Sequence, residues 1–229
     1  PLHPAVLEAM ARPIPHHRTD EFRAVFKECI VGLKSFLKTQ DDVLVLACSG
    51  TGGMEAALAN VLDPGDKMVA LVAGNFGERW EKLGKAYGMQ VQILKAAWGD
   101  AVPPAEVAKA LDADPAIKAV FVQFSESSTG ARHDIEGLAR ITRERPGTLL
   151  VVDAISGAGA MALETQAWGV DVVVVGSQKA LALPPGLAFL SASARAWARI
   201  ESAKSPRFYF DLRRELAELR ELLFAELGA

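Results

Sequence analysis

The residue with the clearest chemical potential is Lys179, which a Gly-Ser-Gln turn separates from the apolar run Asp171–Val175. Four consecutive valines predict a strand that is buried on both faces. Open α/β sheets bind ligands in the crevice beyond the carboxyl ends of their strands, and the lysine is expected there. A partly desolvated lysine amine is a nucleophile toward carbonyl groups. We therefore expect Lys179 to do Schiff-base chemistry.

A glycine-rich turn, Ser49-Gly-Thr-Gly-Gly53, separates an expected strand from a helix expected to start near Met54. Backbone N–H groups at a helix N-terminus, together with two hydroxyls, predict an anion site that suits a cofactor phosphate. The spacing matches neither the nucleoside-triphosphate loop nor the dinucleotide fingerprint. A turn without a ligand is the alternative. Glu55 would oppose a bound anion unless its carboxylate points away.

Three other features follow strands that are expected to be parallel. Asp153 ends an apolar strand, where its carboxylate either holds a ring nitrogen protonated or caps the next turn. Phe76 follows another strand and either stacks on a ligand ring or belongs to the core. The hydroxyl-rich segment 125–130 either binds a ligand oxygen or is a polar loop. The carboxyl ends of parallel strands share one edge of the sheet, so these features are expected to converge.

Apolar runs alternate with helical patterns, which predicts a mostly parallel sheet with helices on both faces. Seven strands are expected, at Val43–Ala47, Lys67–Val72, Met89–Leu94, Ile117–Val122, Thr148–Asp153, Asp171–Val175 and Leu187–Ser191. Helices are expected between them, at Met54–Leu62, Gly77–Tyr87, Pro104–Leu111 and Asp134–Arg143. Three regions result: 1–40 with an irregular arm (Pro1–His17) and a helix (Asp20–Leu37), a large domain (41–211), and an amphipathic helix (212–229).

Composition narrows the functional class. The 229 residues are 50% hydrophobic with a net charge of −3, which argues against nucleic acid as the main partner. No apolar run reaches membrane-spanning length and no signal peptide is recognisable. The two cysteines and four histidines have neither metal-ligand nor triad spacing. We therefore expect a cytoplasmic protein with small-molecule ligands, without a metal, membrane or nucleic acid.

Four motifs carry a resemblance to a known family: residues 49–57 (SGTGGMEAA), 126–130 (ESSTG), 152–156 (VDAIS) and 176–181 (GSQKAL). They resemble the class V aminotransferases, above all the alanine–glyoxylate and serine–glyoxylate (serine–pyruvate) branch, which uses pyridoxal 5′-phosphate (PLP). The resemblance runs from residue 1 to about Asp211. It implies the PLP-binding large domain of fold type I, with a mixed, mostly parallel seven-stranded sheet, and an active site at a homodimer interface.

The resemblance also implies a role for each matching residue. Lys179 would bind PLP as a Schiff base and then move the proton at the substrate Cα, and Asp153 would keep the pyridine nitrogen protonated. Phe76 would stack on the ring, Ile155 would back its other face, and Ser127 would contact its oxygen. The expected phosphate ligands are Ser49, Gly50, Thr51 and Gln178.

The expected reaction moves an amino group from a small amino acid, alanine or serine, to glyoxylate or pyruvate. Another class V reaction is one alternative, but desulfurases typically have histidines where this chain has Phe76 and Gln178. A catalytically poor PLP-binding domain is the other. After Asp211 no segment resembles the family's C-terminal domain, whose arginine grips the substrate carboxylate, so we expect that small domain to be absent. We do not transfer the arginine's role to Arg207.

Overall fold

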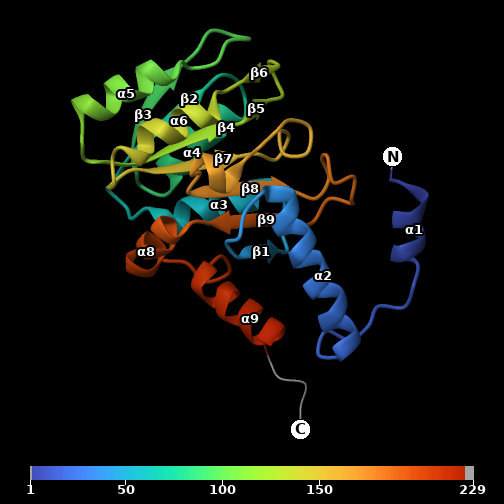
Figure 1. Cartoon of the computed structure of the whole chain (residues 1–229). Coiled ribbons are helices and arrows are strands. Elements are labelled where there is room, and N and C mark those ends of the chain that lie inside the picture. Colours follow the sequence, from blue (N-terminus) through green and yellow to red (C-terminus); the bar gives the residue numbers. More distant parts are fainter. Residues whose placement is uncertain (1, 225–229) are drawn as a thin grey trace.

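The structure is a computed structural model that describes residues 2–224. A seven-stranded sheet of order β1-β9-β8-β7-β4-β2-β3 forms its centre (Figure 1). The strands are β1 (Val43–Leu46), β2 (Lys67–Val72), β3 (Gln90–Lys95), β4 (Ile117–Gln123), β7 (Leu149–Asp153), β8 (Val172–Gly176) and β9 (Ala188–Ala192). All seven predicted strands are confirmed, with ends shifted by a residue at most. A short hairpin of β5 (Ser125–Glu126) and β6 (Ala131–Arg132) follows β4.

The directions of the strands determine at which edge of the sheet the loops that follow them lie. The pairs β8–β7, β7–β4, β4–β2 and β2–β3 are parallel, whereas β9 is antiparallel to both β8 and β1. In this sheet β9 therefore runs against the other six strands, which all point the same way. The carboxyl ends of β1, β2, β4, β7 and β8 lie at one edge, as predicted for a mixed, mostly parallel sheet.

Helices cover both faces of the sheet. They are α1 (Pro4–Met10), α2 (Asp20–Leu37), α3 (Gly50–Val61), α4 (Gly77–Ala86), α5 (Pro104–Ala113), α6 (Ile135–Arg143), α7 (Thr165–Trp168), α8 (Ala194–Ser202) and α9 (Leu212–Phe224). On one face α3 packs between α4 and α8, whereas α6 packs on β7 beside α5 and α7 on the other (Figure 1). Both α2 and α9 contact β1. No helix within residues 2–224 combines the length and apolarity that crossing a membrane requires.

Three helices, α1, α7 and α8, were not predicted from the sequence. The arm Pro1–His17 was expected to be irregular, but α1 begins at Pro4 after the cap residue His3. Proline fits the first helical position because the N–H it lacks has no partner there. The helix has no buried residue and lies apart from the sheet (Figure 1). At α8, Ser193 is the cap residue and accepts a hydrogen bond from the Ala196 amide.

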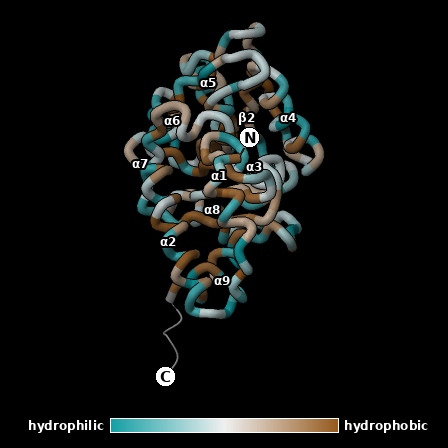
Figure 2. Tube along the Cα trace, turned by 90° about the vertical axis from the view of Figure 1, so that its right-hand side faces the viewer, coloured by the Kyte–Doolittle hydropathy of each residue, from teal (hydrophilic) through white to brown (hydrophobic). Residues whose placement is uncertain are grey.

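The C-terminal helix is amphipathic as predicted, as far as residue 224. Leu212 and Leu219 of α9 are buried, whereas Arg213 and Arg220 form ion pairs with Asp211 and Asp42. Figure 2 shows hydrophobic and hydrophilic colours alternating along this helix. Residues 225–229 of the predicted helix lie outside the described part of the chain.

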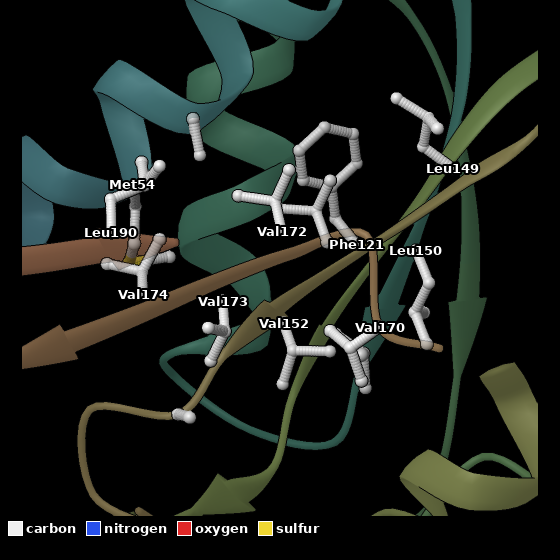
Figure 3. Packing of buried hydrophobic residues seen from close by; sticks show 14 of the residues in the cluster. Met54, Phe121, Leu149, Leu150, Val152, Val170, Val172, Val173, Val174 and Leu190 are labelled. Carbon is white, nitrogen blue, oxygen red and sulfur yellow. The ribbon is translucent and has the colours of Figure 1, made fainter. Parts of the chain in front are cut away.

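Strand β8 shows why the valine run is uninterrupted. All five of its residues are buried, and Val173 points to the opposite face from Val172 and Val174 (Figure 3). Val174 faces α3 so closely that a Cβ added to Gly53 would lie 2.7 Å from its Cγ1. Because helices cover both faces, neither face of β8 tolerates a polar side chain.

A close approach at the start of α4 gives a test of the packing. A Cβ on Gly77 would lie 2.7 Å from the Leu71 carbonyl oxygen and 2.8 Å from the Val72 Cα, both backbone atoms. We expect Gly77→Ala to lower the free energy of unfolding by about 1–3 kcal/mol, measured by urea denaturation. Gly147→Ala is the matched control because its Cβ would meet nothing within 4 Å. Equal stability of the two variants would show that α4 does not depend on this contact.

Candidate functional site

A cavity of about 160 Å³ lies at the edge where the carboxyl ends of the strands meet. Its lining residues come from the segments that follow β1, β2, β4, β7 and β8: Ser49, Gly50, Thr51, Phe76, Arg79, Ser125, Asp153, Ile155, Ser156, Gln178 and Lys179. The structure thus brings together every predicted site residue except Ser127. It adds Arg79, Ser125 and Ser156, which sequence reasoning did not select.

One end of the cavity is the N-terminus of α3. The helix begins at Gly50, not near Met54 as predicted, so the glycine-rich residues form its first turn rather than a preceding loop. Ser49 is the cap residue, and its Oγ accepts a hydrogen bond from the Gly52 amide at 3.4 Å. Amides in a first turn have no partner within their helix. The physical basis of an anion site at this position is therefore present.

The carboxylate of Glu55, which would oppose an anion bound at this turn, points away from the cavity. The Tyr87 hydroxyl, at the end of α4, donates a hydrogen bond to Glu55 Oε1 at 2.5 Å. Glu55 is not among the residues that line the cavity. Its charge is therefore engaged between α3 and α4, away from the cavity.

Asp153 forms a buried, acidic wall of the cavity. Its side chain ends β7, and Oδ1 accepts a hydrogen bond from the Ile155 amide at 2.9 Å. Among the described residues Oδ2 has no hydrogen-bonding partner. Burial raises the pKa of Asp153 to about 6, although the Ile155 amide, Arg79 and Lys179 lower it. A buried carboxylate with one free oxygen suits a cationic N–H donor.

Lys179 lies on the loop between β8 and β9. Ser177 closes this loop: its Oγ donates to the Pro184 carbonyl at 2.6 Å and accepts from the Leu187 amide at 3.3 Å. The Ala182 amide donates to the Lys179 carbonyl at 2.9 Å. Lys179 lines the cavity but is exposed in the single chain, so the partial burial that we expected for its amine is not present there.

Phe76 is held through its backbone by a residue that sequence reasoning missed. The amides of Phe76 and Gly77 both donate to Oε2 of Glu126, at 3.0 and 2.8 Å. The other oxygen of Glu126, Oε1, accepts from the Ser128 hydroxyl at 2.6 Å. Glu126 is fully buried and caps α4, which has no side-chain cap of its own. The signal in the sequence that could have identified Glu126 is the presence of a carboxylate within the hydroxyl-rich segment 125–130.

The same loop departs from the resemblance in one respect. Ser127 is exposed and does not line the cavity of the single chain, whereas Ser125, two residues earlier, does. Ser128 accepts a hydrogen bond from the Asn75 amide at 3.0 Å. The loop thus supports the segment that carries Phe76.

The raised pKa of Asp153 predicts how stability depends on pH. Between its usual 3.8 and about 6 the folded protein keeps a proton that the unfolded chain has lost, so this carboxyl destabilises the fold as pH rises through that window. We expect the free energy of unfolding of cofactor-free Asp153→Asn protein to exceed that of the parent by about 3 kcal/mol or less at pH 8. A pKa shift of about two units corresponds to that energy. The difference should vanish near pH 4. Urea denaturation at several pH values measures it, and a difference independent of pH would contradict the assignment.

Loss of the Glu126 charge should loosen the start of α4. We expect Glu126→Gln to lower the free energy of unfolding by about 1–3 kcal/mol, because an amide cannot accept all of the hydrogen bonds made to this carboxylate. Hydrogen exchange at the Phe76 and Gly77 amides should accelerate as well. Glu136→Gln, at an exposed position in the first turn of α6, is the matched control. Unchanged exchange at both amides would show that Glu126 does not hold this turn.

The chain is similar in sequence to several known proteins. The curated relatives include the soluble hydrogenase 42 kDa subunit of Anabaena cylindrica, 41% identical over 214 residues, or 93% of this chain and 56% of that one. The L-aspartate–glyoxylate aminotransferase of Paracoccus denitrificans is 37% identical over 210 residues, 90% of this chain and 53% of that protein. The chain therefore spans about half the length of the curated relatives it matches.

The solved structures agree with the topology. The alanine–glyoxylate aminotransferase of Nostoc sp. superposes with a TM-score of 0.90 at 30% identity, covering 99% of this chain and 60% of that one. The sheet and its helices are those of the large domain of PLP-dependent enzymes of fold type I. The family described as aminotransferase class-V matches residues 8–208. The chain therefore belongs to the class-V aminotransferase family.

Proposed function

We propose that this chain binds PLP at Lys179 and takes part in amino-group transfer from a small amino acid, alanine or serine, to glyoxylate or pyruvate. The observation that carries the proposal is the convergence of Lys179, Asp153 and the N-terminus of α3 on one cavity. These are an amine, a buried carboxylate and a set of free amides, and their separate strands bring them to one edge of the sheet.

The residues present fit PLP part by part. The amides and hydroxyls of Ser49–Thr51 suit its phosphate, and the free Oδ2 of Asp153 suits a protonated ring nitrogen. Lys179 suits its aldehyde. Phe76 and Ile155 offer apolar walls for the ring, and a Cβ on Gly50 would lie 2.5 Å from Ile155 Cδ1. When bound, PLP supplies an electron sink for a carbanion next to the amino nitrogen.

The side chains then have separate tasks. Asp153, ionised above a pKa of about 6, holds the proton on the ring nitrogen. Lys179 binds the cofactor and afterwards carries the proton to and from the substrate Cα. Phe76 keeps the ring in one plane. The exposure of Ser127 and Lys179 in the single chain supports a site that a second copy helps to enclose, which agrees with the homodimer that the resemblance implies.

A PLP-binding domain with little transferase activity is the second candidate. Arg207, to which we do not assign the role of the family's carboxylate-binding arginine, is engaged in contacts within the fold. Its guanidinium donates to the carbonyls of Ile200, Ala203 and Ser205.

The cytoplasmic location and the division of the chain at residues 40 and 211 stay predictions.

The first experiment asks where the cofactor binds. Protein incubated with PLP and reduced with borohydride should carry a pyridoxyl group on Lys179, identified by peptide mass spectrometry. Lys179→Gln should abolish the adduct, whereas Lys118→Gln, at an exposed lysine on β4, should leave it unchanged. Labelling distributed over several lysines, with none at Lys179, would remove the proposal.

The second experiment separates the two candidates. PLP-loaded protein is assayed with alanine, serine or aspartate as donor and glyoxylate or pyruvate as acceptor; aspartate is included because of the name of the Paracoccus relative. Transfer that Lys179→Gln abolishes supports the aminotransferase. A specific adduct at Lys179 without transfer would favour the poorly active domain.

A further inference from the structure

We infer that Arg79 is a positioning residue that ties the phosphate end of the cavity to its aromatic wall, acting through Thr51 and Phe76. The inference rests on the function proposed above, because it assigns a role toward bound PLP. Arg79 lines the cavity, yet neither the glycine-rich motif nor the lysine motif contains it.

The first contact is with the phosphate end. Arg79 Nη1 donates a hydrogen bond to Thr51 Oγ1 at 2.8 Å, and so joins α4 to the first turn of α3. A threonine hydroxyl that accepts a bond still has its own hydrogen to donate. Among the described residues no acceptor takes that hydrogen. The guanidinium therefore leaves the Thr51 hydroxyl as a donor for an oxyanion at the N-terminus of α3.

The second contact is with the aromatic wall. Arg79 lies three residues after Phe76, one helical turn along the chain, and its Cζ is 5.0 Å from the centroid of the Phe76 ring. A guanidinium over a ring at this distance makes a favourable cation–π contact. The backbone of Phe76 is fixed by Glu126, so the contact with Arg79 restrains what remains free, the orientation of the ring.

Charge supports the same role. Arg79 lowers the pKa of Asp153 more than Lys179 does, whereas Glu126 raises it. An arginine side chain stays protonated at every accessible pH, whereas the Lys179 amine is consumed in binding the cofactor. Arg79 is thus the lasting positive charge beside the carboxylate. Its guanidinium offers five N–H donors in one plane, which allows it to bond Thr51 while it lies against Phe76.

The test compares PLP with pyridoxal, which lacks the phosphate. Dissociation constants are measured by visible absorbance, and the ring environment by induced visible circular dichroism. We expect Arg79→Met to reduce the preference for PLP over pyridoxal by about tenfold, since Thr51 loses a charge-assisted hydrogen bond. The dichroism of both bound ligands should weaken. Arg79→Lys should recover the preference but not the dichroism, because an ammonium can donate to Thr51 but cannot lie flat on the ring.

A double-mutant cycle separates this role from a general loss of stability. If Arg79 acts through Thr51, then Arg79→Met combined with Thr51→Val should reduce the preference no further than Thr51→Val alone. The control is Arg132→Met, which removes a guanidinium 5.7 Å from the Phe124 ring, outside the cavity. Thermal unfolding shows whether Arg79→Met is folded. If it is not, the preference for PLP over pyridoxal is compared between Arg79→Lys and Thr51→Val instead.

Three results would overturn the inference: an equal loss of affinity for both ligands, additive effects in the cycle, or tighter PLP binding by Arg79→Met. The last would mean that the guanidinium occupies space the cofactor needs. These failures are distinguishable from failure of the proposed function. If the parent protein gives no pyridoxyl adduct at Lys179, the proposed function falls and the inference falls with it. If the parent binds PLP and Arg79→Met keeps its preference, only the inference falls.

Discussion

The parallel course of five strands is the constraint on which the site depends. Each of β1, β2, β4, β7 and β8 ends at the same edge of the sheet, and the chain delivers a chemically useful group within a few residues of that end. Parallel neighbours must be joined by crossovers, which places helices over both faces. The central strands are therefore buried on both faces, and only their ends are left for polar chemistry.

Polar contacts between the loops hold the walls of the cavity in relation to each other. Glu126 joins the loop after β4 to the start of α4, and Arg79 joins α4 to the start of α3. A fully buried carboxylate requires several donors to offset its lost hydration, and Glu126 receives them from the distant Phe76–Gly77 segment and from Ser128 in its own loop. The charged side chains of Glu126 and Arg79 thus link the loop after β4, the start of α4 and the start of α3.

The site is built at a cost to stability. Burial, and to a smaller extent the charge of Glu126, raise the pKa of Asp153, whereas the Ile155 amide, Arg79 and Lys179 only partly oppose them. A carboxylate in this situation destabilises the empty protein near neutral pH and favours a bound cation. Burial that is unfavourable for folding is what makes the group useful to a ligand, as is common at functional sites.

The sequence by itself determined the seven strands, most clearly the central ones, because burial on both faces requires runs such as the valines of β8. It also located Lys179, Asp153 and Ser49 at strand ends. Local propensity misplaced the start of α3, since glycines indicate a turn, whereas the Ser49 cap makes them helical. Only the tertiary structure selected Arg79, Glu126 and Ser125. The direction of a loop side chain is set by contacts with segments far away in the sequence, and spacing along one segment carries no record of those contacts.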